Sequence, residues 1–232
     1  GVSADGAVVV GESQGKAFRW TRDEGMLDIG TLGGPWALAW AVSSDGLVVV
    51  GDSANELGVG RAFRWTASGG MEPLGTLDGD NGGSSAHASS ADGSVVVGIS
   101  DSMAGEIHAF RWTTIEGMRD LGTLEGDVSS EARDVSRDGS VVVGWSFSPT
   151  GKRRAFRWTE PGGMQILDTP AGLQSLAYGV AQDGDQIVGA SFATDPELSS
   201  AVRWFVCPAC SADFNTDGFL TFEDFDGFVT GL

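Results

Sequence analysis

Short runs of valine, each ending in glycine and flanked by turn residues, recur along the chain. Three consecutive valines stand at 8–10, 48–50, 95–97 and 141–143. A strand with one face in water alternates apolar and polar residues. Three apolar residues in a row instead predict a strand that is buried on both faces. The pattern therefore predicts an all-β protein whose sheets are sandwiched between neighbouring sheets.

The valine runs belong to a longer repeat with a period of about 45 residues, which is typical of one propeller blade. An Asp-Gly step precedes each run, and the motif A-F-R-W-T follows it after a variable insert. The Asp-Gly steps begin at Asp5, Asp45, Asp92, Asp138 and Asp183. The motif begins at Ala17, Ala62, Ala109 and Ala155, and it decays to A-V-R-W at Ala201.

Each repeat is predicted to form four strands. In the second copy these are strand a (39–43), strand b (the valine run), strand c (A-F-R-W-T) and strand d (71–77). Asp and Gly adopt positive φ at low cost, so the Asp-Gly step predicts a tight turn between a and b. The first copy lacks strand a and the fifth lacks an evident strand d. We therefore expect a β-propeller-like array of about five blades, which either closes by uniting its two ends or forms an open arc.

The arginine of A-F-R-W-T recurs in every copy. Side chains alternate along a strand, so Phe and Trp share one face and Arg takes the other. We expect this arginine to pair with the turn aspartate of the same or a neighbouring copy, or else to contact a ligand. The five residues are Arg19, Arg64, Arg111, Arg157 and Arg203.

The copies differ in their b–c inserts and d–a links, which emerge on the same face of a four-stranded meander. Function often lies on variable loops held by a rigid scaffold, although unconstrained loops also drift. One position in strand a varies as well, five residues before the turn aspartate. It holds Trp40, His87, Arg133 and Tyr178. These side chains are candidate ligand-facing residues around a channel mouth, or filler between blades.

Extra aromatic residues stand near the varied face, at Trp36, Trp145 and Phe147. They suit either a sugar-stacking platform or ordinary packing. A carbohydrate-active enzyme would need carboxylates about 5–10 Å apart near the axis. Asp127, Glu131 and Asp134 are candidates, but carboxylates do not recur at these positions in several copies. With two histidines and no visible nucleophile motif, the sequence predicts no enzyme.

The net charge of −18 argues against a nucleic-acid partner, which requires clustered Lys and Arg. No apolar run reaches the length of a membrane span.

The last segment departs from the repeat and predicts a calcium site. Hard Ca²⁺ binds several oxygen ligands, and a loop of this kind supplies them from positions 1, 3, 5, 7, 9 and 12, with glycine at position 6. Gly218 occupies that position here, and an apolar helix face is expected to follow the loop. The predicted ligands are Asp213, Asn215, Asp217, Phe219 (through its carbonyl), Thr221 and Asp224.

Cys207 and Cys210 stand between the repeats and this loop. A local disulfide in an oxidising compartment is one interpretation. Free or differently paired cysteines are another. A redox pair lacks the βαβ context that it needs, and a zinc site lacks two further ligands.

Two resemblances follow from these motifs. V-S-x-D-G-x-V-V-V-G, A-F-R-W-T and G-M-x-x-L-G-T-L resemble the HAF-type probable extracellular repeat of bacteria, from Val2 to about Trp204. C-P-A-C-x-A-D-F-N-x-D-G-F-L resembles GC-type dockerin-like C-terminal anchors, which carry two loops in tandem where this chain shows one. The first resemblance implies secretion and a β-propeller-like fold, with no established catalytic residues. The second implies a calcium-dependent anchor.

The sequence thus predicts a repeat domain over 1–206 and a dockerin-like calcium-binding tail over 207–232, shortened to a single loop. The predicted function is a secreted, non-catalytic repeat protein for binding or surface display, located outside the cell or on its surface. Its tail would attach to a cohesin-like or cell-surface protein. The alternative is a carbohydrate-binding, lectin-like propeller or a carbohydrate-active propeller enzyme.

Overall fold

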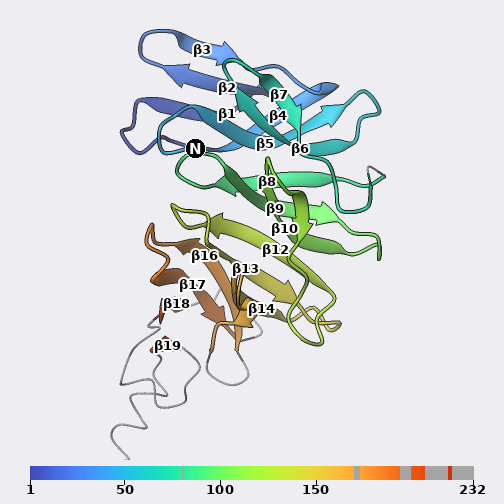
Figure 1. Cartoon of the computed structure of the whole chain (residues 1–232), viewed down its shortest axis with the longest axis vertical. Helices are drawn as coiled ribbons and strands as arrows, with labels where there is room; N and C mark the ends of the chain where they lie inside the picture. Colours follow the sequence, from blue (N-terminus) through green and yellow to red (C-terminus); the bar gives the residue numbers. More distant parts are fainter. Residues whose placement is uncertain (80, 170–172, 194–199, 207–218, 221–232) are drawn as a thin grey trace, which may run out of the picture.

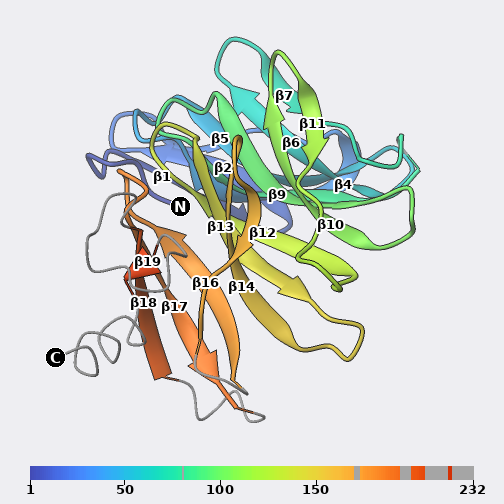
Figure 2. The same cartoon turned by 60° about the horizontal axis from the view of Figure 1, so that its bottom comes forward.

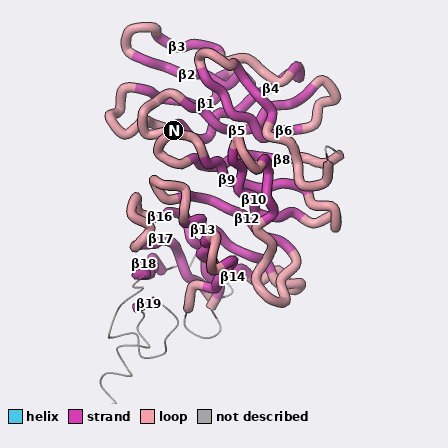
Figure 3. The backbone as a smooth tube through the Cα atoms, viewed as in Figure 1, coloured by secondary structure: helices cyan, strands magenta, loops and turns pink. Residues whose placement is uncertain are grey.

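The chain folds into five antiparallel sheets that follow one another in chain order. The structure, a computed structural model, describes residues 1–79, 81–169, 173–193, 200–206 and 219–220. Figure 1 shows the sheets from the blue first sheet to the orange last one, and Figure 3 shows strands and loops throughout the described residues. The predicted all-β, propeller-like array of five blades is confirmed.

Each sheet is one blade, and its strands are hydrogen-bonded in sequence order. Blade 1 comprises β1 (Val8–Ser13), β2 (Lys16–Thr21) and β3 (Gly25–Asp28). Blade 2 comprises β4 (Gly33–Val42), β5 (Val48–Asn55), β6 (Gly60–Thr66) and β7 (Gly70–Pro73). Blade 3 comprises β8 (Ser84–Ser89), β9 (Val95–Asp101), β10 (Ile107–Thr113) and β11 (Gly117–Asp120). Blade 4 comprises β12 (Ser129–Val135), β13 (Val141–Phe147), β14 (Arg153–Thr159) and β15 (Gly163–Ile166). Blade 5 comprises β16 (Gln174–Val180), β17 (Gln186–Phe192), β18 (Ser200–Val206) and β19 (Phe219–Leu220).

The blades form an arc whose inner side carries the first strand of each sheet. Close packing between the described strands runs from each blade to the next, and the neighbouring pairs β4–β8, β8–β12 and β12–β16 are in contact. The fourth strands β7, β11 and β15 pack mainly within their own blades. Figure 2 shows the sheets fanning outward from this inner side. Residues on the first strands therefore lie nearest the axis, as the sequence predicts.

The valine runs of blades 2, 3 and 4 are buried on both faces of their sheets. In blade 2, Val49 packs toward blade 1 in a cluster with Val8 and Val10, whereas Val48 and Val50 pack toward blade 3. All three are almost completely buried. Burying one such side chain contributes about 1.5–3 kcal/mol relative to leaving it in water. The prediction of strands buried on both faces is confirmed for the three middle blades, whereas Val9 of blade 1 is half-buried and Val188 of blade 5 is 50% exposed.

The turn between strands a and b is built by a buried serine. Ser43 Oγ donates to Asp45 Oδ1 at 2.6 Å and accepts the Val48 amide at 2.9 Å. The same Asp45 oxygen accepts the Leu47 amide. Because the serine oxygen and the aspartate oxygen satisfy backbone donors inside the turn, the geometry repeats wherever Ser-x-Asp-Gly occurs. Blades 1, 3 and 4 carry the same arrangement at Ser3, Ser90 and Ser136.

The turns also connect the blades through their backbones. The residue after each turn serine donates its amide to the carbonyl of the corresponding residue in the next blade, at 2.9–3.1 Å. This ladder joins Ala4, Ser44, Ala91, Arg137 and Gln182 in that order. It fixes the spacing of the blades at the face that carries the a–b and c–d turns.

Both end blades are more complete than the sequence indicates. In blade 1, Gly1 and Val10 exchange two backbone hydrogen bonds of 2.9 Å, so the first residues supply a remnant of strand a. In blade 5, β19 pairs with Phe205 and Val206 and takes the place of strand d. This strand comes from the range that the sequence assigns to the tail, because the edge of β18 presents free backbone groups to any nearby extended segment. No helix in the described part of the chain is long and apolar enough to cross a membrane.

Candidate functional site

The variable position of strand a is the extra residue of a β-bulge. In all four complete first strands the register with strand b shifts across this position, so the bulge residue has no partner. A bulge bends its strand and re-aims a side chain. The four bulge residues are Trp40, His87, Arg133 and Tyr178. They will be called the inner row, because their strands line the inner side of the arc.

A glycine in strand b accompanies each bulge. A Cβ on Gly144 would lie 1.9 Å from the carbonyl oxygen of Glu131, and a Cβ on Gly51 would lie 1.9 Å from that of Leu38. Real Cβ atoms never approach so closely, so strands a and b can come this near to each other only where strand b has glycine. The glycine that ends each valine run therefore permits the backbone geometry that presents the inner row.

Trp40 is 51% exposed, and its indole N–H is hydrogen-bonded to a carboxylate. Its Nε1–H donates to Asp52 of β5, and Ser85 of blade 3 donates to the same Asp52 oxygen at 2.9 Å. These bonds orient the indole without covering its face. Sequence reasoning did not identify Asp52, because the equivalent positions in the other blades hold unrelated residues.

His87 is half-buried and contacts the next blade. Its Nδ1 lies 2.8 Å from the carbonyl oxygen of Ala132, which can only accept, so Nδ1 carries the proton. Burial lowers the pKa of His87, with nearby Arg133 lowering it further. A neutral histidine bound to the next blade matches the interpretation of this position as filler.

Arg133 and Tyr178 both contact Trp145 of β13. The Arg133 guanidinium lies 5.0 Å from the centre of the Trp145 ring. The Tyr178 and Trp145 rings are in an edge-to-face arrangement, with 5.8 Å between their centres. Tyr178 remains 51% exposed, whereas Trp145 is buried. Blade 4 and blade 5 thus meet at an aromatic contact that is open to solvent on the tyrosine side.

Two of the three candidate carboxylates have structural roles. The side chain of Asp127 is fully buried and forms an ion pair of 2.7 Å with Arg154. Asp134 accepts the Val135 and Val180 amides, both at 2.9 Å, while burial raises its pKa. Burial also raises the pKa of Glu131, against the opposing effect of Arg133 and Arg153. Asp127 and Asp134 are therefore engaged in structural contacts.

The recurring arginine does not pair with the turn aspartate, contrary to expectation. Arg64 Nε donates to the carbonyl of Gly93 in the next blade at 3.1 Å. Arg19 and Arg111 reach Gly46 and Gly139 in the same way at 3.4 Å. In the turn aspartate, Oδ1 accepts the turn's own donors, and no ion pair joins this carboxylate to the recurring arginine among the described residues.

The extra aromatic residues divide between packing and partial exposure. Trp145 is buried with Leu176 and Phe192, and Phe147 packs against this cluster beneath the Arg153 guanidinium. Trp36 is half-buried beside Gly60. None of these three residues presents a free, flat platform.

A groove of 1130 Å³ lies between blades 3 and 4, on the face that carries the a–b and c–d turns. Its walls are the a–b turn of blade 4 and the c–d turns of both blades, with Arg111, Ile115 and Trp158 among its lining residues. Arg111 pairs with Glu116, and Arg119 pairs with Glu160 at its edge. Two ion pairs within the protein thus lie along this groove.

The predicted calcium ligands Asp213, Asn215, Asp217, Thr221 and Asp224 lie outside the described residues, as do Cys207, Cys210 and the helix expected after the loop. Phe219 is described only as backbone in β19. Within the described ranges, no group of three or more His, Cys, Asp or Glu side chains is arranged to hold a metal ion.

Comparison of the fold with solved structures finds several similar chains. A protein described as TolB from Agrobacterium tumefaciens aligns with a TM-score of 0.63 and 18% identity, over 87% of this chain and 74% of that one. TolB from Acinetobacter baumannii aligns with a TM-score of 0.56 and 14% identity, over 87% of this chain and 53% of that one. The tricorn protease aligns with a TM-score of 0.59 and 11% identity, over 90% of this chain and 21% of that one.

No family model matches the chain, and no curated protein matches it. At identities this low, the similarity to solved structures establishes the β-propeller fold alone. The choice between binding and catalysis therefore depends on the site.

Proposed function

We propose that this chain is a secreted, non-catalytic binding propeller that presents the inner row to a ligand and is attached through a calcium-dependent, dockerin-like C-terminus. The observation that carries the proposal is the bulge at each variable position. Four unrelated side chains occupy one re-aimed backbone site, and Trp40, Arg133 and Tyr178 keep substantial exposure there. A rigid scaffold with varied residues at one repeated position is typical of binding proteins.

The engagement of Asp127 and Asp134 supports binding over catalysis. A glycosidase needs one carboxylic acid and one carboxylate facing the scissile bond. Here Asp127 is neutralised by Arg154, and Asp134 is held by two backbone amides. A carbohydrate is the ligand that we propose, which was the alternative interpretation of the sequence, since exposed Trp40 and Tyr178 offer apolar ring faces beside polar groups.

The binding function is tested by affinity electrophoresis of the whole chain in gels that contain neutral or acidic polysaccharides. We expect retardation in at least one gel, and its weakening by Trp40→Ala or Tyr178→Ala. Retardation that is unchanged in both variants would show that Trp40 and Tyr178 do not contribute to ligand binding, contrary to the proposal. Release of reducing ends from a bound polysaccharide would instead favour the enzyme.

The anchor is tested by calorimetric titration of calcium into the intact chain and into an Asp213→Ala/Asp217→Ala variant. One site that is lost in the variant supports the anchor, and the search then moves to a cohesin-like partner. No heat at millimolar calcium would refute it.

A further inference from the structure

We propose that the junction between blades 4 and 5 binds an acidic sugar, with the sugar carboxylate on Arg133 and Arg153 and the sugar ring on Tyr178. This inference rests on the proposed binding function and names a ligand class for one part of the inner row. The residues concerned are Glu131, Arg133, Trp145, Arg153 and Tyr178, which will be called the junction cluster.

Arg133 has a guanidinium that is available to a ligand. It stacks over Trp145, and its side chain is 39% exposed. The nearest carboxylate oxygen, on Glu131, is 4.0 Å away, which is beyond hydrogen-bond distance. The contact with Trp145 restrains the guanidinium, and the exposed fraction of the side chain leaves it accessible to a ligand. Such a fork matches the two oxygens of a carboxylate.

Arg153 adds a second positive charge to the same place. Its guanidinium lies 5.6 Å from the centre of the Phe147 ring, on the same face of blade 4. Arg133 and Arg153 both act on Glu131, whose pKa they lower against the effect of burial. Two positive charges thus act on one carboxylate, which leaves a local positive charge on a protein of net charge −18. A local field of this sign attracts an anion.

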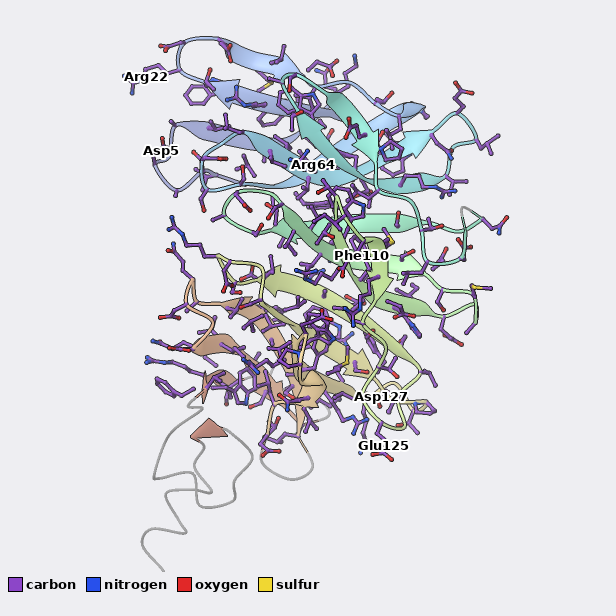
Figure 4. All side chains as sticks on the ribbon, in the orientation of Figure 1. Asp5, Arg22, Arg64, Phe110, Glu125 and Asp127 are labelled. Carbon is purple, nitrogen blue, oxygen red and sulfur yellow. The ribbon has the colours of Figure 1, made fainter. Side chains whose placement is uncertain are left out.

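Neighbouring Arg154 does not contribute to this charge. Its guanidinium binds the buried carboxylate of Asp127 and the carbonyl of Glu125. Figure 4 shows Glu125 and Asp127 together at the loop edge of blade 4. The excess charge therefore comes from Arg133 and Arg153.

Tyr178 provides a surface for the ring of the ligand. Trp145 holds it edge to face, and half of its area is exposed. The negative face of an aromatic ring attracts the C–H groups of a pyranose. Glu131 beside Arg133 supplies an acceptor next to a donor, which suits neighbouring hydroxyls. Blade 4 alone carries tryptophan at this strand b position, where blades 2, 3 and 5 have Asp52, Ile99 and Ala190. The cluster is therefore particular to one junction.

The test is calorimetric titration of the whole chain with hexagalacturonate, with cellohexaose as the neutral control. We expect saturable binding of hexagalacturonate that weakens as ionic strength rises. Arg133→Gln and Arg153→Gln should each weaken it about tenfold or more, because each removes a charge-assisted hydrogen bond. Arg22→Gln is the matched control. It removes the same charge from an exposed turn of blade 1, at the far end of the molecule in Figure 4, and should leave binding unchanged.

Thermal melts of the variants show whether a loss of binding reflects unfolding, and Arg153→Gln retains the stack of Arg133 on Trp145. Equal binding by wild type and the Arg153→Gln variant would overturn the proposal. Binding of a poly-glutamate peptide but not of hexagalacturonate would also overturn it, in favour of an acidic peptide. If only cellohexaose binds and Trp40→Ala abolishes this binding, the proposal of an acidic-sugar site is refuted, whereas the proposed binding function is supported.

Discussion

The carboxylate of Asp134 in blade 4 accepts the backbone amide of Val180 in blade 5 at 2.9 Å, next to the bulge at Arg133. Its other oxygen accepts the Val135 amide. This contact joins two blades beside the axis. It also links the stability of the junction to the ionisation of a single buried group.

The Asp134→Asn variant should gain stability relative to wild type as pH rises. Burial raises the pKa of Asp134 in the folded protein. In the unfolded chain the same group ionises at about 3.9. Wild type therefore loses stability as pH rises from below that value through the raised pKa, and the uncharged asparagine does not. Urea unfolding of both proteins from pH 3 to about 7 measures the difference. A constant difference across this range would contradict the prediction.

Asp92 should show the opposite dependence on pH. Hydrogen bonds from the Ser94 amide and hydroxyl and from the Ser90 hydroxyl lower its pKa to about 2. Its contribution to stability is present above the unfolded pKa of about 3.9 and is lost as pH falls toward about 2. Relative to wild type, Asp92→Asn should be destabilised most at neutral pH and least near pH 2.

Thermal melts across this range test the Asp92 prediction, with Asp183→Asn as the control. Blade 5 has Ala181 in place of the turn serine, and Asp183 accepts the Asp185 amide at 3.1 Å. A larger pH effect for the control than for Asp92→Asn would contradict the assigned hydrogen bonds.

Gly144→Ala should destabilise the protein by at least about 2 kcal/mol. The new Cβ would lie 1.9 Å from the Glu131 carbonyl, so the bulged strand must move. Gly11→Ala in blade 1 is the control, because its Cβ would meet only the Phe18 ring at 3.1 Å. Chemical denaturation of the two variants gives the comparison. Similar losses would mean that the bulges do not require glycine.

Ala181→Ser should stabilise the protein by about 0.5–1.5 kcal/mol, because it restores the turn hydroxyl that blade 5 lacks. In blade 4, Ser136 donates to Asp138 at 2.7 Å and accepts the Val141 amide at 3.0 Å. The reciprocal Ser136→Ala change should cost about 1–3 kcal/mol, because a buried amide loses its acceptor. Differential scanning calorimetry of both variants tests the pair. Destabilisation by Ala181→Ser would show that the blade 5 turn has a different geometry.

The sequence was sufficient to predict the blades, their number and the burial of the valine runs, because these depend on local spacing that recurs in every copy. The position of the inner row followed from the same alignment of copies. The partner of the recurring arginine could not be predicted in this way. It depends on how one blade is offset from the next, and that offset places Gly93, rather than an aspartate, beside Arg64.

By itself, then, the sequence determined the all-β fold, the four-strand repeat and the identity of the variable residues, since hydrophobic periodicity and turn chemistry act over a few neighbouring positions. Only the tertiary structure decided which of these residues are accessible. Trp40 and Tyr178 are open, His87 is locked to Ala132, and Arg133 is stacked on Trp145. The same bulge gives four different outcomes because the side chains meet different neighbours. Trp40 and Arg133 contact Asp52 and Trp145 of their own blades, whereas His87 and Tyr178 contact Ala132 and Trp145 of an adjoining blade. These contacts exist only once the chain has folded.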